Sequence, residues 1–582
     1  MNNKVYDYII AEANTFETTP IQLTRSKTWS MKEHIERCTN VANGWFHNGK
    51  NDGQRPYEDI VTPIVDVAFR SEGFDVKDIV PFVNEAKNSY KSFLIKKYHP
   101  KWARKNELDS FIDEVVESSI IYDLVLIKNV NNVRPEVVPL ENIAFCDQTN
   151  VMKGPICIKD YYNIPDLLAM KGKWDAERID EAIIMAQAEK EAPLAKERKN
   201  KTPGKYIEVF ELHGMLPENW LDENGSPNKY TPQLHIVCYY TNKDGDKNGI
   251  TLFKGKSKKM DQIFKALKID VVRSRGRACG RSVVERLFEP QVWRNYSAIK
   301  LKQLMDAAIT VFQTSDPEIA NQPLSAIKPN TVLKHQDGKP LTKVDGTVQN
   351  TTLFENNSTK MENSARILGS ANEAQLGLNP ASGVPLGTTQ IVTSQGQGIH
   401  EYRQGKISTF FADVLYRDWI LQYLVDDMNQ GKSFSEILTT EEMMEVAEAV
   451  VSNQVEKQIT DLILKGQIVT EADRANLMQL YRTQFMKGGN RKFFEILKDE
   501  LKDIPMDVMV NISAKQRNMA QNADKLTNII REVIRNPGAF AQIPGLGGVF
   551  NQLIEESGFS PIDFTKITRL APVASPPLEQ NQ

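Results

Sequence analysis

The sequence predicts an α+β fold that is predominantly helical, and its central stretch, residues 280–387, gives the main reasons. Residues 291–316 contain neither Gly nor Pro, which predicts one long helix. Two Asp-Gly turn signals within residues 327–348 predict a small strand-and-turn insert. A second helical stretch, residues 357–378, returns the chain and ends in a loop rich in Gly and Pro.

Length and composition are typical of a globular protein with several domains. The chain has 582 residues, of which 41% are hydrophobic and 25% are charged. A net charge of -3 gives no global attraction to nucleic acid or to an anionic membrane, so any DNA contact must be local or weak. Five scattered cysteines without a CxxC pair favour a reducing compartment, without a disulfide framework or a zinc site. We expect neither a signal peptide nor a membrane span.

The first half of the chain predicts a mixture of helices and short strands. Residues 1–55 are polar and Asn-rich, with one candidate helix near 29–45, and we interpret them as an arm or a peripheral helix. The helices expected next are 57–70, 80–98, 107–122 and 159–192. The expected strands are 124–128, 133–138 and 143–146, followed by a β meander of 206–212, 233–240 and 251–253.

Beyond the central stretch the sequence predicts mainly helices. Residues 399–428 carry apolar side chains at the three-and-four spacing of a buried helical face, and Gly431 ends the pattern. Three further helices are expected at 439–466, 470–488 and 491–502, then a strand at 506–512 and a helix from 513 to 536. We expect the Pro-rich residues 571–582 to be flexible.

Motifs for catalysis are absent from the sequence. Residues 249–257 resemble a phosphate-binding loop but have five residues between the glycines where that motif has four. There is no HExxH and no GxSxG, and His213 and His235 lie in expected strands, where a lone histidine is usually structural. The carboxylate pair Asp426-Asp427 fits a solvated helix face. We therefore predict no enzymatic activity and no cofactor.

Three basic stretches leave two interpretations open. Residues 96–105 interleave Tyr98 and Trp102 with lysines, and residues 254–259 and 273–281 are also basic. Such stretches can bind nucleic acid through phosphate neutralisation and stacking, or they can be solvated surface. A helix-turn-helix within 441–485 is a weaker alternative, because acidic residues stand in its second helix.

Four phrases, taken in their order along the chain, resemble a known family. They are Arg134-Pro-Glu-Val-Val-Pro-Leu-Glu-Asn-Ile, Gly280-Arg-Ser-Val-Val-Glu, Asn379-Pro-Ala-Ser-Gly-Val-Pro and Asp507-Val-Met-Val-Asn-Ile. With the order of the predicted elements, they are similar to portal proteins of tailed bacteriophages, of podovirus and crAss-like type. In that family a ring of subunits, typically twelve, occupies one capsid vertex and threads DNA through its axis.

The resemblance implies a portal fold with a division of the chain into named parts. These are an N-terminal arm (1–55), a wing (56–280), a first stem helix (281–314), a clip (315–350), a second stem helix (351–378), a tunnel loop (379–390), a long wing helix (391–435), a helical crown (436–570) and a flexible tail (571–582). Pro290 departs from an uninterrupted stem helix and predicts a kink or a fresh helix start.

The resemblance also implies site residues. The tunnel loop would meet DNA through Asn379, Ser382, Gly383, Val384, Leu386 and Thr388. The stem would pack through Val292, Tyr296, Ile299 and Met305, and the clip would contact the terminase through Lys334, Lys339 and Lys343. An uncharged loop suits a conduit, because every neutralised phosphate would add a grip on moving DNA.

The implied function is a channel for packaging and ejection of double-stranded viral DNA. The implied partners are further copies of the chain, the large terminase subunit, the major capsid protein and head-completion or tail-adaptor proteins, with no membrane. The protein would assemble in the host cytoplasm and reside in the virion. Two alternatives remain at this point: an accessory of a nucleic-acid-processing enzyme, and another virion assembly protein such as a scaffold or tail component.

Overall fold

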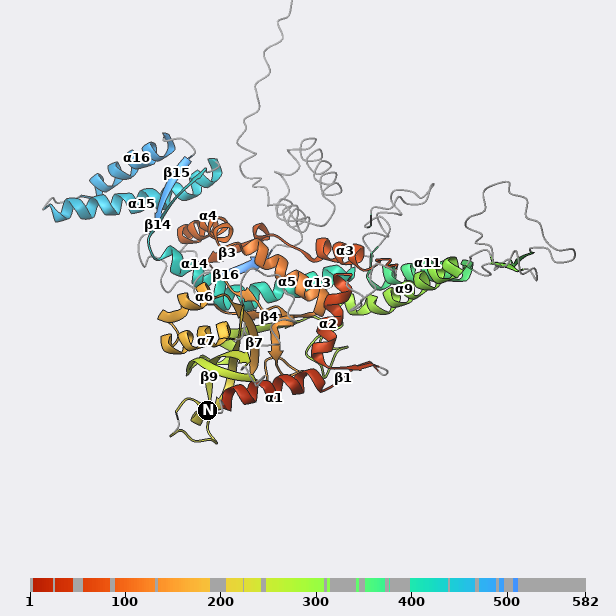
Figure 1. Cartoon of the computed structure of the whole chain (residues 1–582). Coiled ribbons are helices and arrows are strands. Elements are labelled where there is room, and N and C mark those ends of the chain that lie inside the picture. Colours follow the sequence, from red (N-terminus) through yellow and green to blue (C-terminus); the bar gives the residue numbers. More distant parts are fainter. Residues whose placement is uncertain are drawn as a thin grey trace, which may run out of the picture.

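The structure is a computed structural model of the chain, and it describes most of residues 4–510. The gaps in that range are 25–26, 45–55, 84–88, 131–133, 189–205, 223, 242–246, 308–310, 314–341, 345–350, 372–375, 377–397, 438–439, 466–469, 488–490 and 497–505. The described part combines helices and strands, as the predicted α+β class requires (Figure 1).

A five-stranded antiparallel sheet forms one side of the body. Its strands are β6 (Ile143–Phe145), β7 (Ile156–Tyr162), β8 (Ile207–Pro217), β9 (Tyr230–Thr241) and β10 (Lys247–Lys256), in the order β10-β9-β8-β7-β6. The predicted meander is therefore confirmed, and it extends further than expected. Residues 159–162 belong to β7, so the prediction of helix there was wrong. The pairing of β7 with β8 along its whole length outweighs the local helical pattern.

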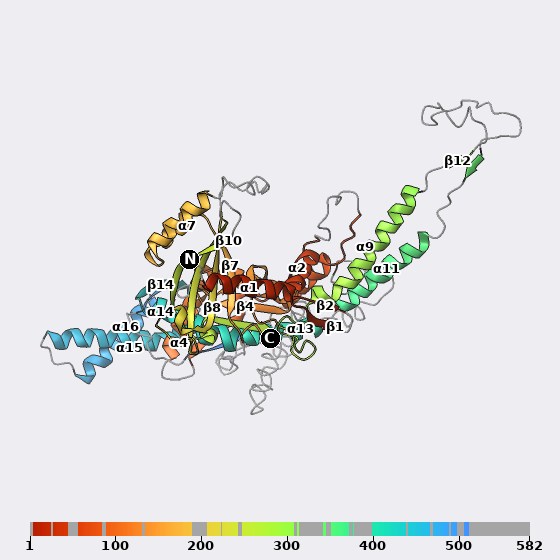
Figure 2. The same ribbon diagram turned by 60° about the horizontal axis from the view of Figure 1, so that its bottom comes forward.

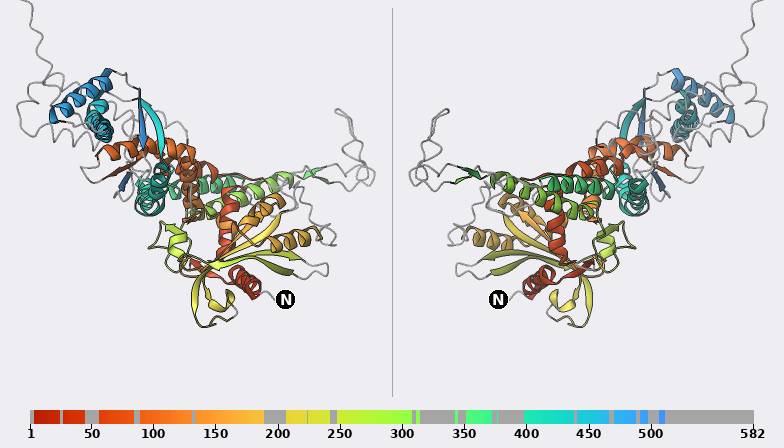
Figure 3. Two further views of the ribbon diagram at one scale, coloured as in Figure 1. Left: turned by 90° about the vertical axis from the view of Figure 1, so that its left-hand side faces the viewer. Right: turned by 90° about the vertical axis from the view of Figure 1, so that its right-hand side faces the viewer.

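Helices pack on this sheet and close a small second core. Helices α6 (Ile164–Ala169) and α7 (Ala176–Ala188) follow β7 along the chain. Leu167 and Ile179 from these helices are buried with Val209 and Leu252 from the strands. The sheet and the helical layer of the body lie on different sides in Figure 3.

The N-terminal segment is part of the main core. It contains α1 (Lys4–Thr18), the hairpin β1 (Ile21–Thr24) and β2 (Lys27–Trp29), and α2 (Met31–Ala42). Ile9 of α1 and Ile35 of α2 are completely buried. The expectation of a peripheral arm was wrong, because the polar, Asn-rich composition hid the apolar stripe by which each helix packs. The helix expected near 29–45 is present as α2.

The central layer of the body combines three helices with small sheets. The helices are α3 (Thr62–Glu72), α4 (Ser89–Lys105) and α5 (Leu108–Tyr122). One sheet pairs β4 (Leu124–Lys128) with β5 (Glu136–Val137) and β11 (Phe264–Lys268), which follows the short helix α8 (Met260–Ile263); another pairs β3 (Ile79–Val83) with β16 (Met506–Val510). Residues 80–83 are thus strand where helix was expected, because β16 supplies the hydrogen-bond partners from far along the chain.

A long helix crosses the body, as predicted for 399–428. It runs as α13 (Gly398–Phe410), a π-helical segment (Phe411–Ile420) and α14 (Leu421–Met428). Ile407, Phe411 and Leu424 are completely buried. Gly431, with φ of 83°, ends the helical path.

A buried ionic cluster fastens this long helix to the body. The Arg403 guanidinium lies 2.9 Å from Glu72 of α3 and 2.6 Å from Asp123 at the end of α5. His400 adds a contact of 3.0 Å between its Nδ1 and Glu72 Oε1. Burial raises the pKa of Asp123, and the neighbouring Arg403 opposes that rise. Because all these side chains are buried, the cluster fixes three helices to one another.

Residues 432–496 form a helical hairpin and a strand pair beside the body. Helix α15 (Thr440–Leu464) is followed by α16 (Glu471–Lys487), and β14 (Lys432–Ile437) pairs with β15 (Arg491–Ile496). A helix was expected at 491–502, and the strand β15 corrects that prediction. Its aromatic side chains suit a strand, and Phe494 packs against Phe434 of β14 with ring centroids 5.5 Å apart. The helix expected from 513 and the flexible tail lie outside the described residues.

Candidate interaction surface on the α9–α11 helix pair

Two antiparallel helices, α9 (Val283–Ala307) and α11 (Thr351–Leu368), project from the body, away from α15 and α16 (Figure 2). Ser282 begins α9, because its Oγ accepts a hydrogen bond of 2.9 Å from the Glu285 amide. The helix has 25 residues, so it is about 38 Å long. Pro290 lies inside it. The predicted fresh start at Pro290 is therefore wrong.

The far ends of the two helices lead into a strand pair. Strand β12 (Val311–Gln313) pairs with β13 (Thr342–Val344), so the helix expected over 291–316 ends earlier than predicted. Val311 is β-branched and Phe312 is aromatic, and such side chains favour a strand. The strand pair bears out part of the strand-and-turn insert expected there.

The second helix also differs in its bounds from the predicted 357–378. It begins six residues earlier and ends at Leu368. Ser370 adopts φ of 54°, and the Ala371 amide donates a hydrogen bond of 3.0 Å to the Arg366 carbonyl. This left-handed turn closes the helix in the manner of a Schellman motif, with serine in the place that glycine usually takes.

The contacts that join the two helices are strongly polar. Arg294 of α9 lies 2.6 Å from Glu362 of α11 and 2.9 Å from Glu58 in the segment before α3. One turn further on, the Asn357 side chain donates a hydrogen bond of 2.8 Å to Ser297. Arg294 is only 18% exposed, so the carboxylates of Glu58 and Glu362 compensate its positive charge in place of water.

The same segment before α3 is hydrogen-bonded to the buried side of α9. The completely buried Gln291 accepts from the Ile60 amide at 3.0 Å and donates to the Glu58 carbonyl at 2.8 Å. Asn295 accepts from the Glu58 amide at 3.2 Å. These bonds fix the direction in which α9 leaves the body.

Large aromatic side chains of α9 face solvent instead of the partner helix. Trp293 is 55% exposed and Tyr296 is 48% exposed, with ring centroids 5.8 Å apart in an edge-to-face arrangement. The Lys300 ammonium lies 5.7 Å from the Tyr296 ring centroid. With Glu289 and Gln303, these residues follow the alternating four-and-three spacing of a coiled-coil seam. We call these five residues the α9 stripe.

Helix α11 also leaves apolar side chains uncovered. Leu353 is 64% exposed, Ile367 is 78% exposed and Leu368 is 42% exposed. Isolated exposed apolar residues are ordinary on a protein surface. Here they accompany the exposed aromatic rings of the α9 stripe, while Arg294, Glu362 and Asn357 supply polar contacts between the helices. Exposed aromatic and aliphatic side chains on one projecting element are typical of a surface that another chain covers.

The predicted stem residues lie on this pair. Val292 and Ile299 are half-buried, whereas Tyr296 belongs to the exposed stripe. Met305 lies in the last described turns of α9. Val292 and Ile299 therefore pack within the chain, whereas the face of α9 that carries Tyr296 is exposed to solvent.

The other predicted site residues lie largely outside the described part of the chain. All the tunnel-loop residues (Asn379, Ser382, Gly383, Val384, Leu386 and Thr388) do so, as do the clip residues Lys334 and Lys339. Lys343 lies in β13, opposite Phe312 of β12.

Several suspected motifs take structural roles. Residues 249–256 form part of strand β10, so they do not form a phosphate-binding loop. His213 and His235 are buried in strands, as expected of structural histidines. Arg277, from the third basic stretch, is buried and lies 2.9 Å from Glu285.

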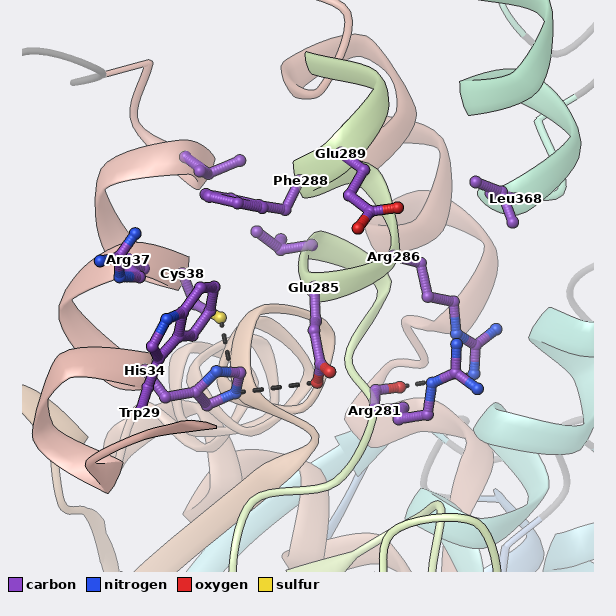
Figure 4. A pocket seen from close by; sticks show the side chains of 12 residues that line it. Trp29, His34, Arg37, Cys38, Arg281, Glu285, Arg286, Phe288, Glu289 and Leu368 are labelled. Atoms are coloured by element: carbon purple, nitrogen blue, oxygen red, sulfur yellow. Dashed lines mark hydrogen bonds and ion pairs between the residues drawn. The ribbon is translucent and has the colours of Figure 1, made fainter. Parts of the chain in front are cut away.

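A cavity of about 190 Å³ lies between α2 and the first turns of α9 (Figure 4). His34 lines it, with Nε2 3.8 Å from Glu285 Oε2 and 3.7 Å from Cys38 Sγ. Burial, with a smaller contribution from Arg277, lowers the pKa of His34 to about 3. The imidazole is therefore neutral at neutral pH. Glu285 is held by Arg277 and acts as a structural partner, so this arrangement does not suggest acid–base chemistry.

Sequence reasoning missed Arg294 and the cavity around His34. The partners of each come from segments far apart in the chain, and neither spacing nor composition signals that they meet. The four-and-three spacing of the α9 stripe is visible in the sequence, but the sequence does not tell which face of the helix is exposed.

No protein-family model matches the chain, and no curated protein sequence matches it either. None of the described helices is both long and apolar enough to cross a membrane.

Proposed function

We propose that the protein is the portal subunit of a tailed bacteriophage. Copies of the chain form a closed ring, with a dodecamer as the expected state, at one vertex of the capsid. Double-stranded viral DNA passes through the ring during packaging and ejection. The large terminase subunit, the major capsid protein and head-completion or tail-adaptor proteins are its partners, and the virion is its final location.

The observation that carries the proposal is the order of parts along the chain. An α+β body comes first, then the projecting helix α9, a strand pair β12–β13, the returning helix α11 and the long helix from Gly398 to Met428. This is the order of wing, stem, clip, stem and wing helix that the resemblance implies. Two of the four sequence phrases lie in described parts of this order: residues 134–143 run from before β5 to the start of β6, and residues 280–285 lead into α9.

The α9–α11 pair supports the ring. A cyclic ring is built from head-to-tail contacts, in which one face of each subunit meets a different face of its neighbour. A stem helix in such a ring needs one face for its own subunit and another for the next. Helix α9 offers both, since Arg294 and Gln291 bind within the chain while Trp293 and Tyr296 remain exposed.

Electron microscopy of the purified full-length protein tests the proposal. Closed rings with a central hole are expected, and their rotational symmetry gives the subunit number. Monomers, open filaments or closed particles without an axial hole would contradict it. Mixing preformed rings with the large terminase subunit tests the second part, since the complex should form on rings and fail to form on dissociated subunits.

A further inference from the structure

Among the described helices, α4 has the largest excess of one sign of charge. Its 17 residues include six basic side chains and no Asp or Glu. The basic residues are Lys91, Lys96, Lys97, Lys101, Arg104 and Lys105. The whole chain has a net charge of -3, so the positive charge of this helix is a local feature of the surface.

The basic side chains of α4 gather on its outer face. Lys96, Lys101, Arg104 and Lys105 are exposed, whereas Ile95, His99 and Trp102 on the other side are buried. Lys101 is tied to its surroundings, because its ammonium donates to the Ser435 carbonyl at 2.6 Å and lies 4.8 Å from the Phe434 ring centroid. Among the described side chains, no ion pair involves Lys96, Arg104 or Lys105.

The aromatic residues of this basic stretch face inward. Trp102 is only 3% exposed, and the Tyr98 hydroxyl donates a hydrogen bond of 2.6 Å to Asp427 of α14. Bases of single-stranded nucleic acid would need exposed rings on which to stack. The rings of this stretch are therefore not placed to stack on bases. Any nucleic-acid contact here would have to be made by the charged side chains.

The composition of the outer face distinguishes between two kinds of anionic partner. An interface with an acidic protein would be expected to have an apolar or aromatic centre within a polar rim. The exposed face of α4 between Lys96 and Lys105 carries cations and Pro100, with no exposed large apolar side chain. Contacts to the nucleic-acid backbone need only Lys and Arg within reach of phosphates.

We propose that the outer face of α4, through Lys96, Arg104 and Lys105, binds the phosphate backbone of duplex DNA without reading its sequence. This surface lies beside β14 and α14, away from the projecting α9–α11 pair (Figure 1). It is a second DNA contact, made by other residues than the tunnel loop 379–390 of the proposed portal, and it needs side chains of one subunit only. Binding is weak and strongly salt-dependent because it consists of charge neutralisation.

The test is fluorescence anisotropy of a labelled 30-base-pair duplex with the full-length protein over a series of salt concentrations. The variant Lys96→Ala/Arg104→Ala/Lys105→Ala should weaken binding about tenfold or more at low salt. The slope of log affinity against log salt should fall by about 2 to 3, since each lost phosphate contact removes about 0.9. Lys96→Arg/Lys105→Arg keeps both charges and should bind like the wild type.

The matched control is Lys256→Ala/Lys258→Ala/Lys259→Ala, which removes three exposed positive charges elsewhere on the body. It should change the affinity by less than about twofold, because those charges lie outside the proposed surface. An equal loss in this control, or no loss in the α4 variant, overturns the proposal. Preferential capture of a polyglutamate peptide over the duplex by wild-type protein also overturns it. Ring formation is followed separately by light scattering, so failure here and failure of the portal proposal are told apart.

Discussion

The body and the α9–α11 pair are stabilised in opposite ways. In the body, apolar side chains such as Phe111 and Phe411 are completely buried, and the charges that enter the core are paired, as Arg403 is with Glu72. In the helix pair, the inner contact is polar, through Arg294 and Glu362, while Trp293 remains exposed. The helix pair has the surface of a structure that a neighbouring chain completes.

This difference separates two consequences of mutation. A change in the body should lower the free energy of unfolding of the single subunit. A change on the outer face of the helix pair should leave that free energy almost unchanged and affect assembly.

The largest effect is expected from Arg403→Met in the body. The substitution keeps much of the side-chain volume but leaves the carboxylates of Glu72 and Asp123 buried without their cation. Removing one partner of a buried ion pair costs about 3–5 kcal/mol. Urea unfolding measures the loss. The control Arg417→Met breaks the Asp413 pair, in which both side chains are 55% exposed, and should change stability by less than about 1 kcal/mol. Equal effects of the two variants would mean that the cluster does not fasten the body.

Acidification should lower the free energy of unfolding by about 2 kcal/mol for each of three buried histidines. Burial lowers the pKa of His34 to about 3 and that of His99 and His235 to about 4. An unfolded histidine titrates near 6.5, so below that pH the unfolded chain binds more protons and stability falls. Between pH 7 and pH 5 the loss approaches about 2 kcal/mol per histidine, and it continues until the folded pKa is reached.

Unfolding free energies at pH 7 and pH 5 check this prediction. His99→Gln, which can still hydrogen-bond to the Tyr416 hydroxyl, should reduce the pH-dependent part while a variant on the helix pair should not. The described helices α9 and α11 contain no histidine, so the acid effect belongs to the body. An unfolding free energy that is the same at pH 7 and pH 5 would show that these imidazoles have the same pKa in the folded and the unfolded chain.

A smaller effect is expected from Arg294→Met in the helix pair. The guanidinium is partly shielded, but Glu362 is 33% exposed and Glu58 is 43% exposed, so solvent compensates for part of the lost attraction. We expect a loss of about 1 kcal/mol. A double-mutant cycle with Glu362→Gln isolates the pair, and a coupling indistinguishable from zero would contradict the role assigned to Arg294.

The smallest effect on the single subunit is expected from Trp293→Ser/Tyr296→Asp. Both side chains are about half exposed, so unfolding of the isolated subunit should change by less than about 1 kcal/mol. Unfolding is measured at a protein concentration low enough to keep the subunit monomeric. A loss of several kcal/mol would show that this face is buried within the chain itself.

The sequence predicts well those elements whose partners are local. Strand β4 has the predicted bounds, because a buried apolar run ending at Lys128 marks it directly. At β3 and β15 the sequence predicts helix, and the structure has strand because the partners β16 and β14 come from distant parts of the chain. Pairing over such distances leaves little trace in local periodicity.

For the candidate surface, the sequence predicts the helices but not which face is free. The spacing of Val292, Tyr296 and Ile299 marks apolar positions around α9, and only the structure distinguishes the half-buried Val292 from the exposed Tyr296. The inner contact escapes prediction because Arg294 meets Glu58 and Glu362 from two distant segments. Charged side chains without a local partner give no periodic signal.

The most direct test of the account is the mass distribution of the assembled protein in wild type and in Trp293→Ser/Tyr296→Asp, measured by mass photometry at the same concentration. The account predicts closed assemblies of a single size for the wild type and folded monomers for the variant. Arg417→Met serves as the control and should assemble like the wild type. Intact assemblies in the Trp293/Tyr296 variant, or a monomeric wild type, would contradict the claim that a neighbouring copy covers the α9 stripe.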